Sequence, residues 1–153
     1  MLLSRTASAA LLNHLCGKSS SVSIGSNGNC WLGLFTTKPT EEGTGGVEVS
    51  SANTNYTRIN ISSLMSATNR QAINLNDINF NAAIVPSDPD AQTGADWGTI
   101  VAFGLFTTQT GGSPYAWGDL LTPVTVNTQN TLHFLTDNFE IILDEVSSSA
   151  SGN

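Results

Sequence analysis

The residue types that most often perform chemistry are few in this sequence, and their spacing does not assemble a reactive site. His14 and His133 lie far apart, and neither Cys16 nor Cys30 has a second Cys or His at a convincing metal-ligand spacing. The sequence contains no nucleophile elbow, phosphate-binding loop or dinucleotide fingerprint. We therefore predict no catalytic residue, no metal site and no cofactor, and we expect that the protein is not an enzyme.

Carboxylates occur in local pairs rather than as partners from distant segments. A glycosidase requires two carboxylates about 5–10 Å apart across a cleft, and nothing in the sequence selects such a pair. Asp88 and Asp90 are alternate carboxylates that suit Ca²⁺, but the Gly and the terminal Glu of a calcium-binding loop are missing. Turn formation explains the same residues without a metal.

The two cysteines are too few for a disulfide scaffold. We expect two buried or half-buried thiols in a reducing compartment, with a Cys16–Cys30 bridge as the alternative. The apolar run near the N-terminus is short and is broken by Asn13 and His14, so we do not expect a secretion signal.

Charge and hydropathy narrow the possible partners. The 153 residues carry a formal net charge of -7, with only five Lys and Arg residues, which lie well apart from one another within the first 70 residues. Nucleic acid and anionic membrane surfaces would repel such a protein, so we predict neither as a partner. No stretch approaches the roughly 18 apolar residues of a membrane span. We expect a protein that is made in the cytoplasm.

Residues 4–16 form the one good helix candidate. Ser4 or Thr6 is available to cap its start, and Gly17 can end it. Its apolar stripe consists of Ala7, Leu11, Leu12 and Leu15. Such a stripe packs either on the body of its own chain or on a neighbouring subunit or another protein. We predict these four residues as a partner-docking site.

The five residues Gly-Leu-Phe-Thr-Thr occur twice, at 33–37 and at 104–108. Each copy ends an apolar run rich in β-branched and aromatic residues, and a Gly-rich loop follows, so we predict two equivalent central strands. With about eight strands separated by turn residues, the predicted fold class is all-β. We expect an antiparallel β-sandwich, jelly-roll or immunoglobulin-like, with one short N-terminal α-helix.

The predicted organisation has four parts: the helix at 1–17, a loop at 18–29, the β-sandwich domain at 30–146 and a Ser-rich tail at 147–153. Residues 55–61 alternate, which predicts a half-buried strand with Tyr56, Arg58 and Asn60 on its outer face. Residues 62–71 are expected to be irregular, and residues 124–135 to form a hairpin. The asparagines at 74, 76, 79 and 81 are expected on a solvated strand face.

Five aromatic residues could form a stacking platform for sugars: Trp31, Tyr56, Trp97, Tyr115 and Trp117. The alternative, which we favour, is that Trp97 and Trp117 flank the two ends of a paired hairpin and pack in the core.

Several motifs together resemble a known family. They are Trp31–Thr40 with its sequel Gly43–Val49, Tyr56–Arg58, Ile78–Phe80, Asp96–Phe106, Trp117–Leu120, Pro123–Asn127 and Phe139–Asp144. Over roughly residues 30–144 the chain is similar to small bacteriophage virion proteins labelled as tail-fibre or head-decoration proteins. Where that family has a tight connection before Trp97, this chain has the longer segment 81–95, which we interpret as a contact loop particular to this protein.

The resemblance implies a non-enzymatic phage virion structural protein, assembled in the host cytoplasm. Its expected partners are other virion proteins of the capsid or tail, and we expect a homo-oligomer. A compact domain has neither the repeats nor the coiled-coil shaft usual in a tail fibre. We therefore favour a capsid decoration or a head- or tail-attached adaptor. The alternative is a tail-fibre receptor-recognition module that binds host surface carbohydrate.

Overall fold

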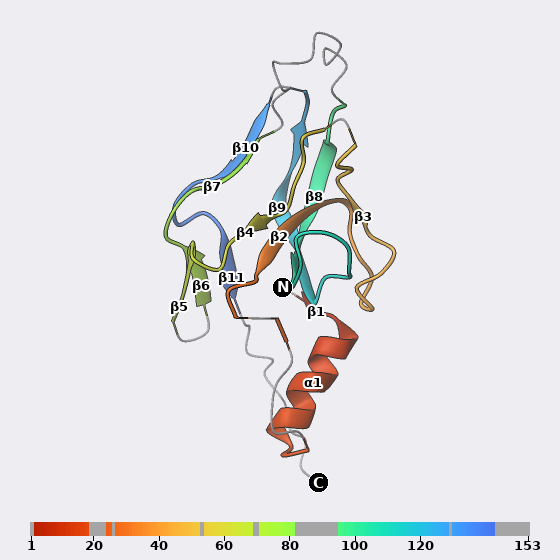
Figure 1. Ribbon diagram of the computed structural model, residues 1–153, viewed down its shortest axis with the longest axis vertical. Coiled ribbons are helices and arrows are strands. Elements are labelled where there is room, and N and C mark those ends of the chain that lie inside the picture. Colours follow the sequence, from red (N-terminus) through yellow and green to blue (C-terminus); the bar gives the residue numbers. More distant parts are fainter. Residues whose placement is uncertain are drawn as a thin grey trace.

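The computed structural model describes residues 2–18, 24–25, 27–52, 54–68, 71–81, 95–128 and 130–142. These residues form three antiparallel sheets and one helix at the N-terminus (Figure 1). The predicted all-β class with a short N-terminal helix is confirmed. Asp88 and Asp90, for which we favoured turn formation over a calcium site, lie outside the described residues. The Ser-rich tail and most of segment 81–95 lie outside them as well.

The main sheet has six strands in the order β1-β9-β8-β2-β3, and β4 also pairs with β2. Their bounds are β1 (Leu2–Leu3), β2 (Trp31–Thr37), β3 (Val47–Glu48), β4 (Ile59–Asn60), β8 (Gly98–Phe106) and β9 (Ala116–Val126). β8 lies at the centre, between β9 and β2. The loop between β8 and β9 turns through Gly111 and Gly112, whose positive φ angles of 68° and 70° favour glycine. β8 and β9 therefore form an antiparallel hairpin around this loop.

The two copies of Gly-Leu-Phe-Thr-Thr lie side by side. β2 and β8 are antiparallel, and their register places Gly33 directly opposite Gly104. Because side chains alternate across a strand, the two glycines share one face of the sheet with Phe35 and Phe106. The prediction of two central strands is confirmed, and the register adds an approximate twofold relation between them.

Each glycine makes room for the phenylalanine of the other copy. A Cβ on Gly104 would lie 2.6 Å from Cε2 of Phe35, and a Cβ on Gly33 would lie 2.8 Å from Cε2 of Phe106. The two rings stack nearly parallel, with centroids 6.0 Å apart and an interplanar angle of 17°. The repeated motif therefore encodes one packing unit, in which ring and glycine alternate across the strand pair.

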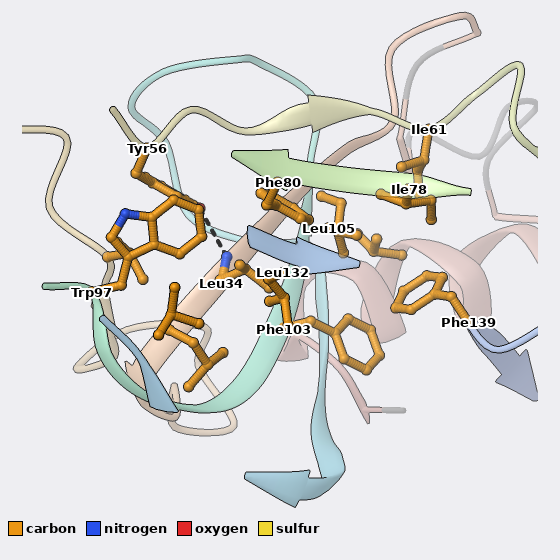
Figure 2. Packing of buried hydrophobic residues seen from close by; sticks show 14 of the residues in the cluster. Leu34, Tyr56, Ile61, Ile78, Phe80, Trp97, Phe103, Leu105, Leu132 and Phe139 are labelled. Atoms are coloured by element: carbon orange, nitrogen blue, oxygen red, sulfur yellow. Dashed lines mark hydrogen bonds between the residues drawn. The ribbon is translucent and has the colours of Figure 1, made fainter. Parts of the chain in front are cut away.

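Two smaller sheets complete the fold. β7 (Ile78–Asn81) pairs with β10 (Thr131–Phe134), and β6 (Gln71–Asn74) lies between β5 (Met65–Thr68) and β11 (Glu140–Ile142). The main core lies between the face of the large sheet that carries Leu32 and Leu34 and the inner residues of β7 and β10 (Figure 2). Ile78 and Phe80 contribute from β7. The smaller cluster on the opposite face contains Phe35, Ala102 and Phe106.

Two predicted elements differ from the structure. Residues 65–68, which we expected to be irregular, form β5 and pair with β6. Residues 124–135 do not form a hairpin, because β9 continues to Val126 along β8 while β10 pairs with β7. β8 is long enough for β9 to pair with it as far as Val126, whose partner is Gly98. The register shifts near Val101 of β8, so residues 120–123 of β9 form a bulge in which Leu121 is fully exposed.

The expectation that all four asparagines lie on a solvated face is wrong for Asn74, which is completely buried. Its amide donates to the carbonyls of Asn76 and Leu135 at 2.9 and 2.8 Å, and its side-chain oxygen accepts the N–H of Phe139 at 2.8 Å. The asparagine thus satisfies backbone groups of two turns at once. A buried amide is tolerated because its hydrogen bonds are made.

The glycine pair gives a first prediction. Gly104→Ala should lower the free energy of unfolding by about 1–3 kcal/mol, because the new methyl group overpacks against Phe35. Urea denaturation measures this, with Thr107→Ala, an exposed residue just beyond the strand, as the matched control. The double variant Gly104→Ala with Phe35→Leu should recover part of the lost unfolding free energy, because leucine lacks the ring atom that the new methyl group meets. Equal stability of Gly104→Ala and the control would contradict the packing described.

Candidate attachment site and the buried arginine cluster

The predicted docking helix forms α1 (Arg5–Leu15), and its ends are capped. The Ser4 hydroxyl accepts the N–H of Ala7 at 3.3 Å. At the other end Gly17 has a φ of 68°, and its N–H donates to the His14 carbonyl while that of Lys18 donates to the Asn13 carbonyl. These two bonds form a Schellman motif. Of the two predicted capping residues, Ser4 is the N-cap, and the predicted end at Gly17 is confirmed.

The four predicted docking residues have very different environments. Ala7 is buried and Leu11 is half-buried, whereas Leu12 and Leu15 are 60% and 70% exposed. The helix extends away from the sheets, at the bottom of Figure 1. Within its own chain the stripe is therefore fully buried at Ala7, near the base of the helix, and partly buried at Leu11. The outer part of the stripe lies on the surface.

The base of the helix is held by backbone contacts. β1 pairs with β9 through Leu2 and Leu3, and the N–H of Ser4 donates to the Tyr115 carbonyl at 2.9 Å. The N–H of Arg5 donates to the Glu41 carbonyl at 3.1 Å. The Arg5 guanidinium also approaches Glu42 at 2.6 Å, but exposed ion pairs contribute only about 0–1 kcal/mol. The backbone bonds therefore set the direction of the helix.

A second candidate site surrounds Arg58, which is 5% exposed. Its Nε and Nη2 donate to the two oxygens of Glu48 at 2.8 and 2.7 Å. Its Nη1 donates to the carbonyls of Thr108 and Gly111 at 2.9 and 2.8 Å. The guanidinium carbon lies 3.3 Å from the centroid of the Phe106 ring. One arginine thus joins β3, the loop after β8 and the aromatic face of the repeat.

Tyr56 occupies a gap along the edge of β2. β4 pairs with Trp31 and Leu32, β3 pairs from Phe35 onward, and the N–H of Leu34 lies between them. The Tyr56 hydroxyl accepts this N–H at 2.8 Å, drawn as a dashed line in Figure 2, and donates to Glu48 at 2.9 Å. Burial, followed by the charge of Glu48, raises the pKa of the Tyr56 phenol above its usual value.

The predicted outer face of residues 55–61 is therefore wrong for Tyr56 and Arg58. Only Ile59–Asn60 is a strand, so the alternation before Ile59 does not follow the pleat of a sheet. The signal that the sequence offered was chemical, because Tyr56 and Arg58 are separated only by Thr57 and a carboxylate, Glu48, precedes them in the same part of the chain. Period-two alternation cannot distinguish a solvated charge from one buried against a carboxylate.

The predicted aromatic platform is not assembled. Tyr56, Trp97 and Trp117 are all buried, while Trp31 and Tyr115 are half-buried. The Trp97 ring packs edge-on against Tyr56 in the main core, and its indole N–H donates to the Thr54 carbonyl. A groove of about 370 Å³ lies beside Arg58, but Tyr56 is the one aromatic residue that lines it and is 4% exposed. The packing interpretation of Trp97 is confirmed.

Both cysteine thiols are free, and the alternative bridge between them is not formed. Cys16 is exposed, contrary to our expectation, because it caps the projecting end of α1. Cys30 is half-buried with its sulfur 3.2 Å from the Tyr115 hydroxyl, and burial raises the pKa of its thiol. Within the part of the chain that the structure describes, no three His, Cys, Asp or Glu side chains gather as a metal site would require.

Comparison with known families identifies the class. The chain matches the family described as "Podophage GP4 fiber I protein gp80" over residues 2–142, which is most of its length, and it belongs to that family. It is therefore a bacteriophage virion structural protein of a fibre family. Comparison with curated proteins gives no match. No helix among the described residues is long and apolar enough to cross a membrane.

The arginine cluster leads to a stability prediction. Arg58→Met should lower the free energy of unfolding by about 3–5 kcal/mol, because Glu48 loses its ion-pair partner and two loop carbonyls lose their donor. Arg58→Lys should cost less, since it keeps the charge. Lys38→Met removes an exposed pair with Asp119 and should change stability by about 0–1 kcal/mol. Urea unfolding of the three variants tests this order, and equal effects for Arg58→Met and Lys38→Met would refute it.

The Tyr56 phenol leads to a pH prediction. At neutral pH, Tyr56→Phe should lower the unfolding free energy by about 1–3 kcal/mol, because the N–H of Leu34 loses its acceptor. The folded state holds the phenol proton more tightly than the unfolded chain, whose Tyr pKa is 10.0, so the contribution of Tyr56 is complete below that pH and declines above it. The difference from wild type should therefore narrow above about pH 10. A difference that stays constant between pH 7 and pH 11 would contradict this assignment.

Proposed function

We propose that this protein is a structural component of a phage fibre assembly and that α1 attaches it to the particle. The observation that carries the proposal is the exposure of Leu12 and Leu15 on a helix whose base is bonded to the main sheet. The helix is therefore held in a fixed direction, while the outer part of its apolar stripe, Leu12 and Leu15, stays open to a partner.

The physical chemistry of α1 supports this role. A helix of 11 residues is marginally stable in water by itself, and in proteins such a helix gains most of its stability by packing an apolar face. Burying a leucine side chain contributes about 1.5–3 kcal/mol. A partner that covers Leu12 and Leu15 would both bind the helix and stabilise it.

Among the virion positions considered from the sequence, the fibre has the support of the family description. A capsid decoration or a head- or tail-attached adaptor would use the same helix, so the attachment mechanism does not depend on the position. Host carbohydrate is a weaker candidate ligand, because three of the five aromatics of the expected platform are buried.

The test replaces the exposed leucines and follows incorporation into particles. Leu12→Gln with Leu15→Gln should leave the fold intact and reduce the amount of this protein in purified virions at least tenfold. The matched control is Leu121→Gln, a fully exposed leucine on the bulge of β9. Quantitative immunoblotting of particles measures incorporation, and immunogold labelling of wild-type particles tests the fibre position.

Normal incorporation of the helix variant would show that α1 is not the attachment element. Label over the head shell instead of the fibres would favour decoration and refute the fibre position.

A further inference from the structure

A second exposed apolar site lies at the corner where the β6–β7 and β10–β11 connections meet. Asn74 bonds to Asn76 in the first connection and to Leu135 in the second. Asp77 joins the same connections, because its carboxylate accepts the N–H and the hydroxyl of Thr136 at 2.8 and 3.0 Å. The two connections at this corner are therefore held together by side-chain hydrogen bonds, those of buried Asn74 and those of exposed Asp77.

This corner combines exposed leucines with negative charge. Leu75 and Leu135 are each 55% exposed. Asp77, Asp137 and Glu140 are exposed at or beside the same connections. The segments 71–81 and 130–142 contain no Lys or Arg, and Arg70, which precedes β6, is outside the described residues. We call Leu75, Asp77, Leu135 and Asp137 the acidic corner.

The helix has the complementary character. Residues 1–18 contain Arg5 and Lys18 and no Asp or Glu, so the negative charge of the chain lies entirely after α1. Arg5 is engaged with Glu41 and Glu42 at the base. At the free end, exposed Leu12 and Leu15 are followed by exposed Lys18. An apolar stripe with a cation beside it fits an apolar surface with carboxylates beside it.

We propose that α1 of one copy docks on the acidic corner of a second copy of the same chain. This inference rests on the proposed function, since it names the partner of the attachment helix. The helix and the corner are different surfaces of one molecule, so the contact is heterologous. Each copy then offers one helix and one corner, and successive copies join head to tail into a ring or an open row.

Analytical ultracentrifugation of the full chain tests the contact. Wild type should assemble with rising concentration above its monomer mass of 16.0 kDa. Leu12→Gln with Leu15→Gln, and separately Leu75→Gln with Leu135→Gln, should raise the dissociation constant about tenfold or more. Leu121→Gln should assemble as wild type does. Lys18→Glu and Asp137→Asn should each weaken assembly, more strongly at low salt than at high salt.

Mixing the two defective proteins gives the most specific result. The helix variant keeps its corner and the corner variant keeps its helix, so a mixture should form a complex of one copy each, although neither variant assembles alone. Wild type that stays monomeric at millimolar concentration, or a mixture that stays monomeric, would overturn the proposal, and so would a corner variant that assembles normally.

The two proposals fail separately. If wild type is monomeric in solution but the helix variant is lost from particles, α1 binds another virion protein, and the self-contact is refuted while the proposed function stands. If wild type assembles through α1 and the helix variant still enters particles, the self-contact stands and the attachment role is refuted.

Discussion

The cross-strand pair of Gly33 and Gly104 is the constraint on which the rest of the structure depends. Its register fixes which face of β2 and β8 carries the leucines of the main core and which carries Phe35 and Phe106. A shift of one residue would exchange those faces. The absence of side chains at this pair is as important as the rings above it, because each ring occupies the volume that a Cβ would fill.

The Phe106 side of the aromatic face created by that pair is covered by polar groups rather than by another sheet. Arg58 lies on the Phe106 ring and bonds to Glu48 and to the loop after β8, while the Tyr56 hydroxyl accepts the N–H of Leu34 in the gap between β4 and β3. A buried charge is tolerated only when its donors are satisfied. Among the described residues no buried side-chain N or O lacks a partner. The packing of the Phe106 ring and the hydrogen bonds of Arg58 and Glu48 therefore depend on each other.

The sequence predicted the features that depend on local pattern. The caps of α1 follow from residue types at fixed spacing, and β2 and β8 follow from dense apolar runs with turn residues after them. Features decided by distant partners were missed. Asn74 and Arg58 are polar in sequence, and only the backbone carbonyls and the carboxylate that surround them explain their burial. Similarly, the pairing of β10 with β7 depends on a long β9 that excludes the expected hairpin.

The outer edge of β9 is paired only at Ala116 and Trp117 within the described residues, where β1 covers it. Beyond this point the strand departs from its ladder through the bulge at residues 120–123, which includes Pro123, a residue without a backbone N–H. A flat, regular edge would be a template for stray strands and hence for aggregation. The bulge and the proline remove that template. The part of this edge that β1 leaves uncovered is therefore a poor site for pairing with a strand of another molecule.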